Sequence, residues 1–322
     1  QFFEMSSRKI PLICSGHSRP VPDFSYSPIT EDGFFMVSAC LDGKPMLRNG
    51  MTGDWLGTFV GHKGAVWSAH INSTALQVIT GSADYTAKLW NALTGEELHS
   101  FAHSRIIKSV CFSPDDKCIL TGGQDKILRI FDLNKPESEP ICVEGHTQPI
   151  KVAIWSVKDG NIFVSGGQDG MLRIWDKRTL SEVKSHNVKS SITSIEASLD
   201  RKHLTVTCGK EVSFWNVETF EHIKTHTLSV EAGSASLAPD SATYVVGGTD
   251  FWVRVFDFAS GKELELHKGH HGPVHCTRFA PDGQTFASGS EDGTIRLWQA
   301  GEVKSYGLWQ ETQLQESQPV KI

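Results

Sequence analysis

The chain has 322 residues, of which 39% are hydrophobic and 21% charged, and its formal net charge is −6 with a sequence pI near 6.2. This balance excludes wholesale disorder, and the negative net charge excludes a basic character over the whole surface, which is the usual footprint of tight binding to nucleic-acid backbones. No uninterrupted apolar run is long enough for a membrane-spanning helix, while 29 glycines and 9 tryptophans favour tight turns and β structure.

Residues 1–9 are predicted to form an N-terminal tail, and the four that precede Met5 are interpreted as upstream or cloning-derived sequence. The first 14 residues contain no apolar core followed by a small-residue cleavage site, so no secretion signal is predicted. The 7 cysteines are scattered and form no Cys-x-x-Cys pair. We therefore expect reduced thiols and a cytoplasmic and nuclear location.

From residue 10 onward the chain is built from an internal repeat. In the five strongest copies an Asp precedes an aromatic residue by six positions, and these are Asp84, Asp125, Asp169, Asp250 and Asp292. Two weaker copies have Asp42 followed by Arg48 instead of an aromatic residue, and Gly209 in the Asp position followed by Trp215. Seven copies result, at the interval of about 40–45 residues that is typical of one β-propeller repeat.

A second marker, Gly-His or a degenerate form of it, precedes each copy. Its histidines are His17, His62, His103, His146, His186, His226 and His270. Short alternating runs such as residues 119–121 and 163–165, separated by Asp-Gly-type turns, predict strands joined by hairpins. Four such strands form a small sheet that buries its faces only by stacking against neighbouring sheets.

With both markers in phase seven times, the chain resembles the WD-repeat β-propeller family. The resemblance covers residues 10–299 and predicts an all-β fold, a seven-bladed WD40 β-propeller. Because the last copy ends with its third strand at Trp298, a strand near residues 10–14 is expected to complete the last blade. Residues 300–322 are predicted to be a C-terminal extension and tail, in which the aromatic pair of residues 306–309 packs on the propeller wall or on a partner.

The resemblance implies a hydrogen-bonded tetrad of His, Ser or Thr, Asp and Trp inside each complete blade. The predicted tetrads are His62, Thr80, Asp84 and Trp90; His146, Ser165, Asp169 and Trp175; and His270, Ser288, Asp292 and Trp298. The fifth blade lacks the Asp, and the sixth has Val246 in the hydroxyl position. We expect these two blades to be locally less stable, because a buried Asp and its donors satisfy one another.

The sequence predicts no catalytic, cofactor or metal site. Five to seven of the 14 histidines belong to the repeat, which places them in separate blades, and no His-Glu-x-x-His, P-loop or nucleophile-elbow pattern occurs. The aspartates are periodic as well, which indicates turns rather than paired general acids. We therefore predict that the protein is not an enzyme.

Two positions in each repeat are expected to reach the propeller rim and contact partners. One immediately precedes the turn Asp, and the other follows the first apolar residue after each Gly-His. Together with a nearby arginine they give the candidate set Trp67, Arg105, Lys108, Gln124, Lys151, Gln168, His275 and Glu291. Trp67 either forms an interface hot spot or packs between blades, and Lys108 and Lys151 beside Arg105 form a basic patch or are separately solvated charges.

The proline-containing segment 134–140 is interpreted either as an inert loop between third and fourth strands or as a side-surface contact. Residues 42–48, 52–59, 61–67, 122–126, 132–137 and 306–309 closely resemble one family of WD-repeat scaffolds. Members of that family join the survival-of-motor-neuron (SMN) complex. The family carries a longer acidic C-terminal extension, whereas this chain ends at Ile322 without one, which puts any role of that extension in doubt.

The family resemblance implies a non-enzymatic protein–protein interaction scaffold in spliceosomal snRNP assembly and mRNA processing. The implied partners are Gemin- and Sm-type SMN-complex members, an Unr-type RNA-binding protein, and TGF-beta receptor and Smad proteins. RNA would be contacted only indirectly, with no membrane, cofactor or small-molecule substrate. The alternatives are an adaptor for an RNA-associated translation regulator, a protein that binds RNA itself through Lys108 and Lys151, or another WD scaffold such as a translation-initiation subunit or a ubiquitin-ligase receptor. The last would need an appended domain, and too few residues follow Trp298 for one.

Overall fold

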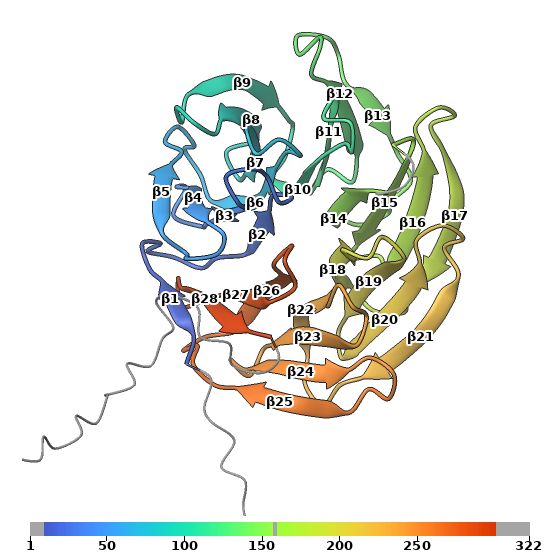
Figure 1. The fold of residues 1–322 in the computed structure, drawn as a ribbon. Helices are drawn as coiled ribbons and strands as arrows, with labels where there is room; N and C mark the ends of the chain where they lie inside the picture. Colours follow the sequence, from blue (N-terminus) through green and yellow to red (C-terminus); the bar gives the residue numbers. More distant parts are fainter. Residues whose placement is uncertain (1–9, 157–159, 301–322) are drawn as a thin grey trace, which may run out of the picture.

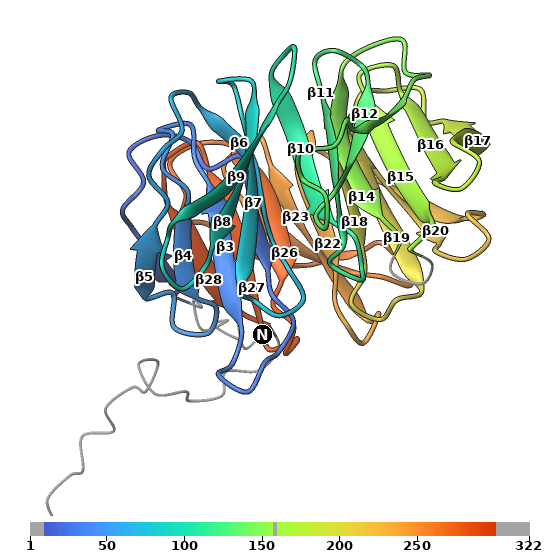
Figure 2. The same ribbon diagram turned by 90° about the horizontal axis from the view of Figure 1, so that it is seen from above.

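The computed structural model describes residues 10–156 and 160–300, which form seven four-stranded antiparallel sheets around a central channel (Figure 1). Each sheet is one blade, and the side view shows the sheets standing next to one another (Figure 2). The predicted seven-bladed β-propeller is confirmed. No helix in the described part of the chain could span a bilayer.

The blades share one order, from an inner strand at the channel to an outer strand at the rim. The inner strands are β2 (Asp23–Tyr26), β6 (Val66–Ile71), β10 (Ile107–Phe112), β14 (Ile150–Trp155), β18 (Ile192–Ala197), β22 (Ala232–Leu237) and β26 (Val274–Phe279). The second strands are β3 (Phe35–Ala39), β7 (Gln77–Ser82), β11 (Cys118–Gly123), β15 (Ile162–Gly167), β19 (His203–Cys208), β23 (Thr243–Gly248) and β27 (Thr285–Ser290).

The outer half of each blade follows the same pattern. The third strands are β4 (Met46–Asn49), β8 (Thr86–Asn91), β12 (Leu128–Asp132), β16 (Met171–Asp176), β20 (Glu211–Asn216), β24 (Val253–Asp257) and β28 (Ile295–Gln299). The outer strands of blades 1 to 6 are β5 (Trp55–Thr58), β9 (Glu97–Ala102), β13 (Ile141–Val143), β17 (Ser181–Asn187), β21 (His222–Thr227) and β25 (Glu263–His267). The segment 134–140 joins β12 to β13, the third to the fourth strand of blade 3.

The N-terminal strand β1 (Leu12–Cys14) supplies the outer strand of blade 7. It pairs antiparallel with β28, with Leu12 opposite Leu297 and Cys14 opposite Ile295. The expected closure of the ring by the N-terminal strand is therefore present, with the strand starting at Leu12 rather than at residue 10. Residues 1–9 and 301–322, including the aromatic segment 306–309, lie outside the described residues.

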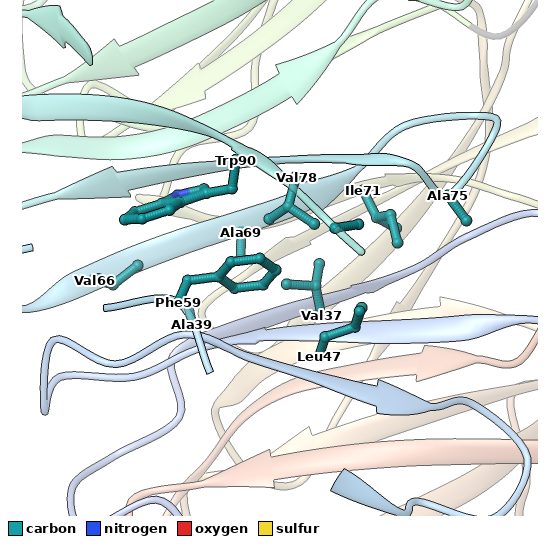
Figure 3. Packing of buried hydrophobic residues seen from close by; sticks show 11 residues of the cluster. Val37, Ala39, Leu47, Phe59, Val66, Ala69, Ile71, Ala75, Val78 and Trp90 are labelled. Carbon is teal, nitrogen blue, oxygen red and sulfur yellow. The ribbon is translucent and has the colours of Figure 1, made fainter. Parts of the chain in front are cut away.

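The core consists of apolar clusters between adjacent blades. Between blades 1 and 2, Trp90 and Phe59 pack with Val37 and neighbouring aliphatic side chains (Figure 3). Glycines on the second strands allow neighbouring blades to pack closely against each other. A Cβ on Gly81 of β7 would lie 2.7 Å from Cγ2 of Ile107, the first residue of β10. Glycine thus sets the close packing between neighbouring blades.

A β-bulge at the second residue of the inner strand recurs in six blades. The register with the second strand shifts between the first and third residues of β6, β10, β14, β18, β22 and β26. A bulge leaves one extra residue unpaired and redirects its side chain. The bulged residues Trp67, Lys108, Lys151, Thr193 and His275 all line the channel.

Serines at the third position of inner strands connect neighbouring blades at the channel wall. The amide of Ala153 in blade 4 donates to Ser109 Oγ of blade 3 at 2.9 Å, and the amide of Val110 in blade 3 donates to Ser68 Oγ of blade 2 at 3.3 Å. These buried hydroxyls satisfy backbone donors between sheets that share no strand pairing.

Candidate functional site

The predicted tetrad of blade 2 forms a continuous hydrogen-bonded chain. The Trp90 indole N–H donates to Thr80 Oγ1 at 2.8 Å, and the Thr80 hydroxyl lies 2.7 Å from His62 Nε2. His62 Nδ1 lies 2.8 Å from Asp84 Oδ2. Because the carboxylate only accepts, His62 donates through Nδ1–H and its Nε2 accepts from the Thr80 hydroxyl.

Blades 4 and 7 repeat this geometry with serine in place of threonine. His146 Nδ1 lies 2.9 Å from Asp169 Oδ2, and its Nε2 lies 2.7 Å from Ser165 Oγ, which accepts from the Trp175 indole at 2.8 Å. In blade 7, His270 Nδ1 lies 3.0 Å from Asp292, and its Nε2 lies 2.7 Å from Ser288 Oγ, which accepts from the Trp298 indole at 2.8 Å. Every polar group of these chains is engaged inside its own blade.

The other blades keep only parts of the tetrad. In blade 5 the Trp215 indole donates to Ser213, and His186 Nε2, on the outer strand β17 of blade 4, contacts the carbonyl of Phe220. His226, on the outer strand β21 of blade 5, lies 2.9 Å from the hydroxyl of Tyr244 in blade 6. Asp250 accepts from Arg254 rather than from a histidine. The lower local stability of these two blades stays a prediction.

Blade 1 contains Arg48 where the five strong copies have an aromatic residue. The guanidinium is buried and donates to the carbonyls of Ser15 and Gly53 at 2.5 and 3.2 Å. Beside it, His17, Cys40 and Asp42 bring three potential ligand atoms within 4.8 Å of one another, the one such group among the described residues. His17 Nε2 lies 2.7 Å from Ser38 Oγ and His17 Nδ1 lies 3.6 Å from Asp42 Oδ2, as in the tetrads of blades 2, 4 and 7. Burial raises the pKa of the Cys40 thiol to about 12, and the thiol donates to the Arg19 carbonyl.

The tetrad of blade 2 makes stability depend on pH. Burial alone would raise the pKa of Asp84, but hydrogen bonds from His62, Thr86 and the Lys63 amide hold it well below its usual range. An unfolded Asp titrates near pH 3.9, so the stabilising contribution of Asp84 is complete above about pH 5 and declines as the pH falls.

Replacing Asp84 with Asn is expected to cost about 1–3 kcal/mol at neutral pH, because buried donors lose a charged acceptor. The free energy of unfolding of this variant should then fall less between about pH 5 and pH 3 than that of the wild type. Urea unfolding at both pH values measures this, with the exposed Asp32→Asn as control. Equal pH dependence of wild type and Asp84→Asn would contradict the assignment.

The central channel forms a cavity with a volume of about 890 Å³. Residues of all seven inner strands line it. We define its mouth as the end at which the inner strands begin. Trp67, Lys108, Lys151, His275 and Glu291 of the candidate rim set lie here and line the channel.

Trp67 and Lys108 contact each other across the boundary between blades 2 and 3. The ammonium of Lys108 lies 2.8 Å from the centroid of the Trp67 ring, in a cation–π arrangement. Trp67 therefore both lines the channel and contacts the next blade. Burial, together with the nearby charge of Lys151, lowers the pKa of Lys108 to about 7. The two lysines are therefore close enough for one charge to affect the other. Arg105, in contrast, is exposed and does not line the channel.

The part of the mouth on blades 7 and 1 has different chemistry. His275 Nε2 lies 2.7 Å from Glu291 Oε2, and Pro22 and Leu41 supply apolar wall. Gln124 and Gln168 are exposed and lie outside the channel lining. The basic and aromatic groups therefore gather on blades 2 to 4, and the carboxylate lies on blade 7.

Deeper in the channel the structure brings together charges that the sequence analysis missed. Arg278 lies 3.6 Å from Asp23 and 3.7 Å from Glu196, and it donates to Ser234 at 2.8 Å. Burial raises the pKa of Glu196 to about 7 despite the nearby Arg278. The three charged residues Asp23, Glu196 and Arg278 come from blades 1, 5 and 7, so a pattern within one repeat does not predict that they meet.

The WD40 family model (WD domain, G-beta repeat) matches residues 53–91, 95–132, 138–176 and 261–299. The serine-threonine kinase receptor-associated protein of Dictyostelium discoideum is 56% identical over 89% of this chain and 98% of its own length. The protein of the same name from Gallus gallus is 52% identical over 95% and 87% of the two chains. Eukaryotic translation initiation factor 3 subunit I of Schizosaccharomyces pombe is 28% identical over 89% and 95%.

The fold, the internal tetrads and the repeat matches together define a WD-repeat β-propeller, a class of protein-interaction scaffold without catalytic function. Within this class the chain belongs to the serine-threonine kinase receptor-associated protein family. That family name describes association with a kinase receptor and does not assign kinase activity. The family resemblance predicted from the sequence is confirmed.

Proposed function

We propose that the chain is a scaffold of the SMN complex that assists spliceosomal snRNP assembly by holding Gemin- and Sm-type proteins. The observation that carries the scaffold role is the division of polar groups: the tetrad groups bond inside the blades, whereas Trp67, Lys108 and Lys151 face an open channel mouth. The assignment to the SMN complex rests on the family resemblance of residues 42–48, 52–59 and 61–67.

Affinity purification of the tagged chain from cells, followed by mass spectrometry, tests this proposal. We expect Gemin- and Sm-type proteins among the specifically recovered partners, compared with a purification from cells that express the tag alone. Recovery of folded chain without any such protein would contradict the proposal.

The names of the relatives also support a receptor-associated role. We propose that the chain contacts TGF-beta receptor and Smad proteins in the cytoplasm and modulates their signalling, in addition to acting in the cytoplasm and nucleus with the SMN complex. Co-precipitation with the receptor and a Smad-dependent reporter measure this role. An unchanged reporter on both depletion and overexpression would contradict it.

A second candidate is an adaptor for an Unr-type RNA-associated translation regulator. It rests on the same family resemblance of residues 42–48, 52–59 and 61–67. Ribonuclease treatment of the purified sample distinguishes a direct protein contact from a contact bridged by RNA. A direct protein partner stays bound when RNA is removed. Loss of the Unr-type protein on this treatment would count against the adaptor.

A further inference from the structure

The mouth of the channel carries a cluster formed by Trp67, Lys108 and Lys151, the second residues of β6, β10 and β14. These three inner strands are consecutive around the ring (Figure 1). Each of the three residues occupies the bulge position of its strand, which directs its side chain to the channel. The cluster is therefore built from rigid strands rather than from loops.

The cluster has donors without acceptors. Neither Lys108 nor Lys151 forms an ion pair with any carboxylate in the described parts of the chain, although the two ammonium groups are close enough to affect each other. The Trp67 indole N–H is buried and has no hydrogen-bond acceptor among the described residues. Two neighbouring lysine amino groups and an unused N–H donor beside an open mouth suit an anionic group.

We propose that this mouth binds an acidic segment of a protein partner, with one Asp or Glu carboxylate held between Lys108 and Lys151. The proposal rests on the scaffold function proposed above and names the chemistry of the bound segment. Pro22 and Leu41 on the adjacent wall accept an apolar side chain of the same segment. A peptide that alternates acidic and apolar residues therefore fits the mouth.

The charge distribution favours a peptide over RNA. Glu291 lies across the mouth, and Asp23 and Glu196 line the channel below it. A nucleic-acid backbone carries a charge at every nucleotide and would meet these carboxylates, whereas a peptide can place a single carboxylate on the lysine side. The net charge of −6 opposes a polyanion further.

A random peptide library displayed on phage, selected on the full chain, tests the proposal. We expect the selected peptides to be enriched in Asp and Glu. The strongest peptide is then synthesised with a fluorescein label, together with a control copy in which each Asp or Glu is changed to its amide. In fluorescence polarisation the acidic peptide should bind about tenfold more tightly than the control, or better.

Variants of the chain identify the place of binding. Lys108→Met and Lys151→Met should each weaken binding of the labelled peptide about tenfold or more, and Lys108→Arg should restore most of it. Lys117→Met is the matched control, because Lys117 follows the other end of β10 and its side chain is 66% exposed. The Lys117→Met variant should bind the labelled peptide with the same affinity as the wild type. Urea unfolding midpoints verify that each variant is folded.

Selection of peptides without acidic residues would overturn the proposal, as would equal peptide binding by Lys108→Met, Lys151→Met and wild type. A lysine-dependent affinity for oligouridylate RNA without affinity for the acidic peptide would also overturn it. The proposed function is tested separately, since purification with the wild-type chain reports on SMN-complex partners. If those partners bind both lysine variants unchanged, the scaffold role stands and the assignment of the mouth fails.

Discussion

Replacing Trp90 with Ala is expected to lower the free energy of unfolding by about 3–5 kcal/mol. The indole is fully buried in the cluster between blades 1 and 2, where its ring centroid is 5.6 Å from that of Phe59 (Figure 3). Truncation leaves a cavity between two sheets and also removes the donor to Thr80, the first link of the tetrad. Urea unfolding followed by far-ultraviolet circular dichroism measures the change.

Trp55→Ala provides the matched control for this prediction. Trp55 lies on the outer strand β5 and is 60% exposed, so its replacement should change stability by no more than about 0.5 kcal/mol. Equal destabilisation by the two substitutions would show that the tetrad tryptophan is not a core residue.

Removing residues 1–14 is expected to destabilise the propeller by about 3 kcal/mol or more. The deletion takes away β1, whose Cys14 is buried and whose Leu12 packs against the same cluster as Leu297. The deletion removes the apolar surface that Leu12 and Cys14 bury. It also exposes the edge of β28, whose residues are all buried in the complete ring. The loss should appear as a lower urea midpoint and as increased aggregation through the exposed strand edge.

A chain without residues 1–9 keeps β1 whole and is the control for this deletion. Its unfolding midpoint should match that of the full chain. If removal of residues 1–14 left the midpoint unchanged as well, the ring would not depend on closure by its N-terminal strand.

The fold could be predicted from the sequence because its interactions recur at a fixed spacing. His62, Thr80, Asp84 and Trp90 all lie within one repeat, so their register in the sequence predicts their contact. The closing role of β1 was predicted by counting strands, since the last repeat contains only three.

The channel could be predicted only in part. The bulge positions of Trp67, Lys108 and Lys151 follow from the repeat, but the placement of Lys108 over the Trp67 ring depends on how two blades pack. Arg105 precedes its strand on the loop and does not share the channel with the lysines. A repeat pattern reports the position along a blade and not the geometry between blades.

Contacts across the ring had no signal in the sequence. Asp23, Glu196 and Arg278 meet only because the seven sheets close on one another. The marker histidines that precede blades 5 and 6 are a second example. His186 and His226 have lost their tetrad partners, and each bonds instead to a group that tertiary packing brings near it.

The central claim is that partners bind at the channel mouth while the tetrads serve as internal scaffold. Amide hydrogen exchange, measured by mass spectrometry with and without the selected acidic peptide, tests this claim most directly. The account predicts slower exchange on binding at the first residues of β6, β10 and β14, and unchanged exchange in the outer strands β5, β9 and β13. Slower exchange confined to those outer strands would contradict it.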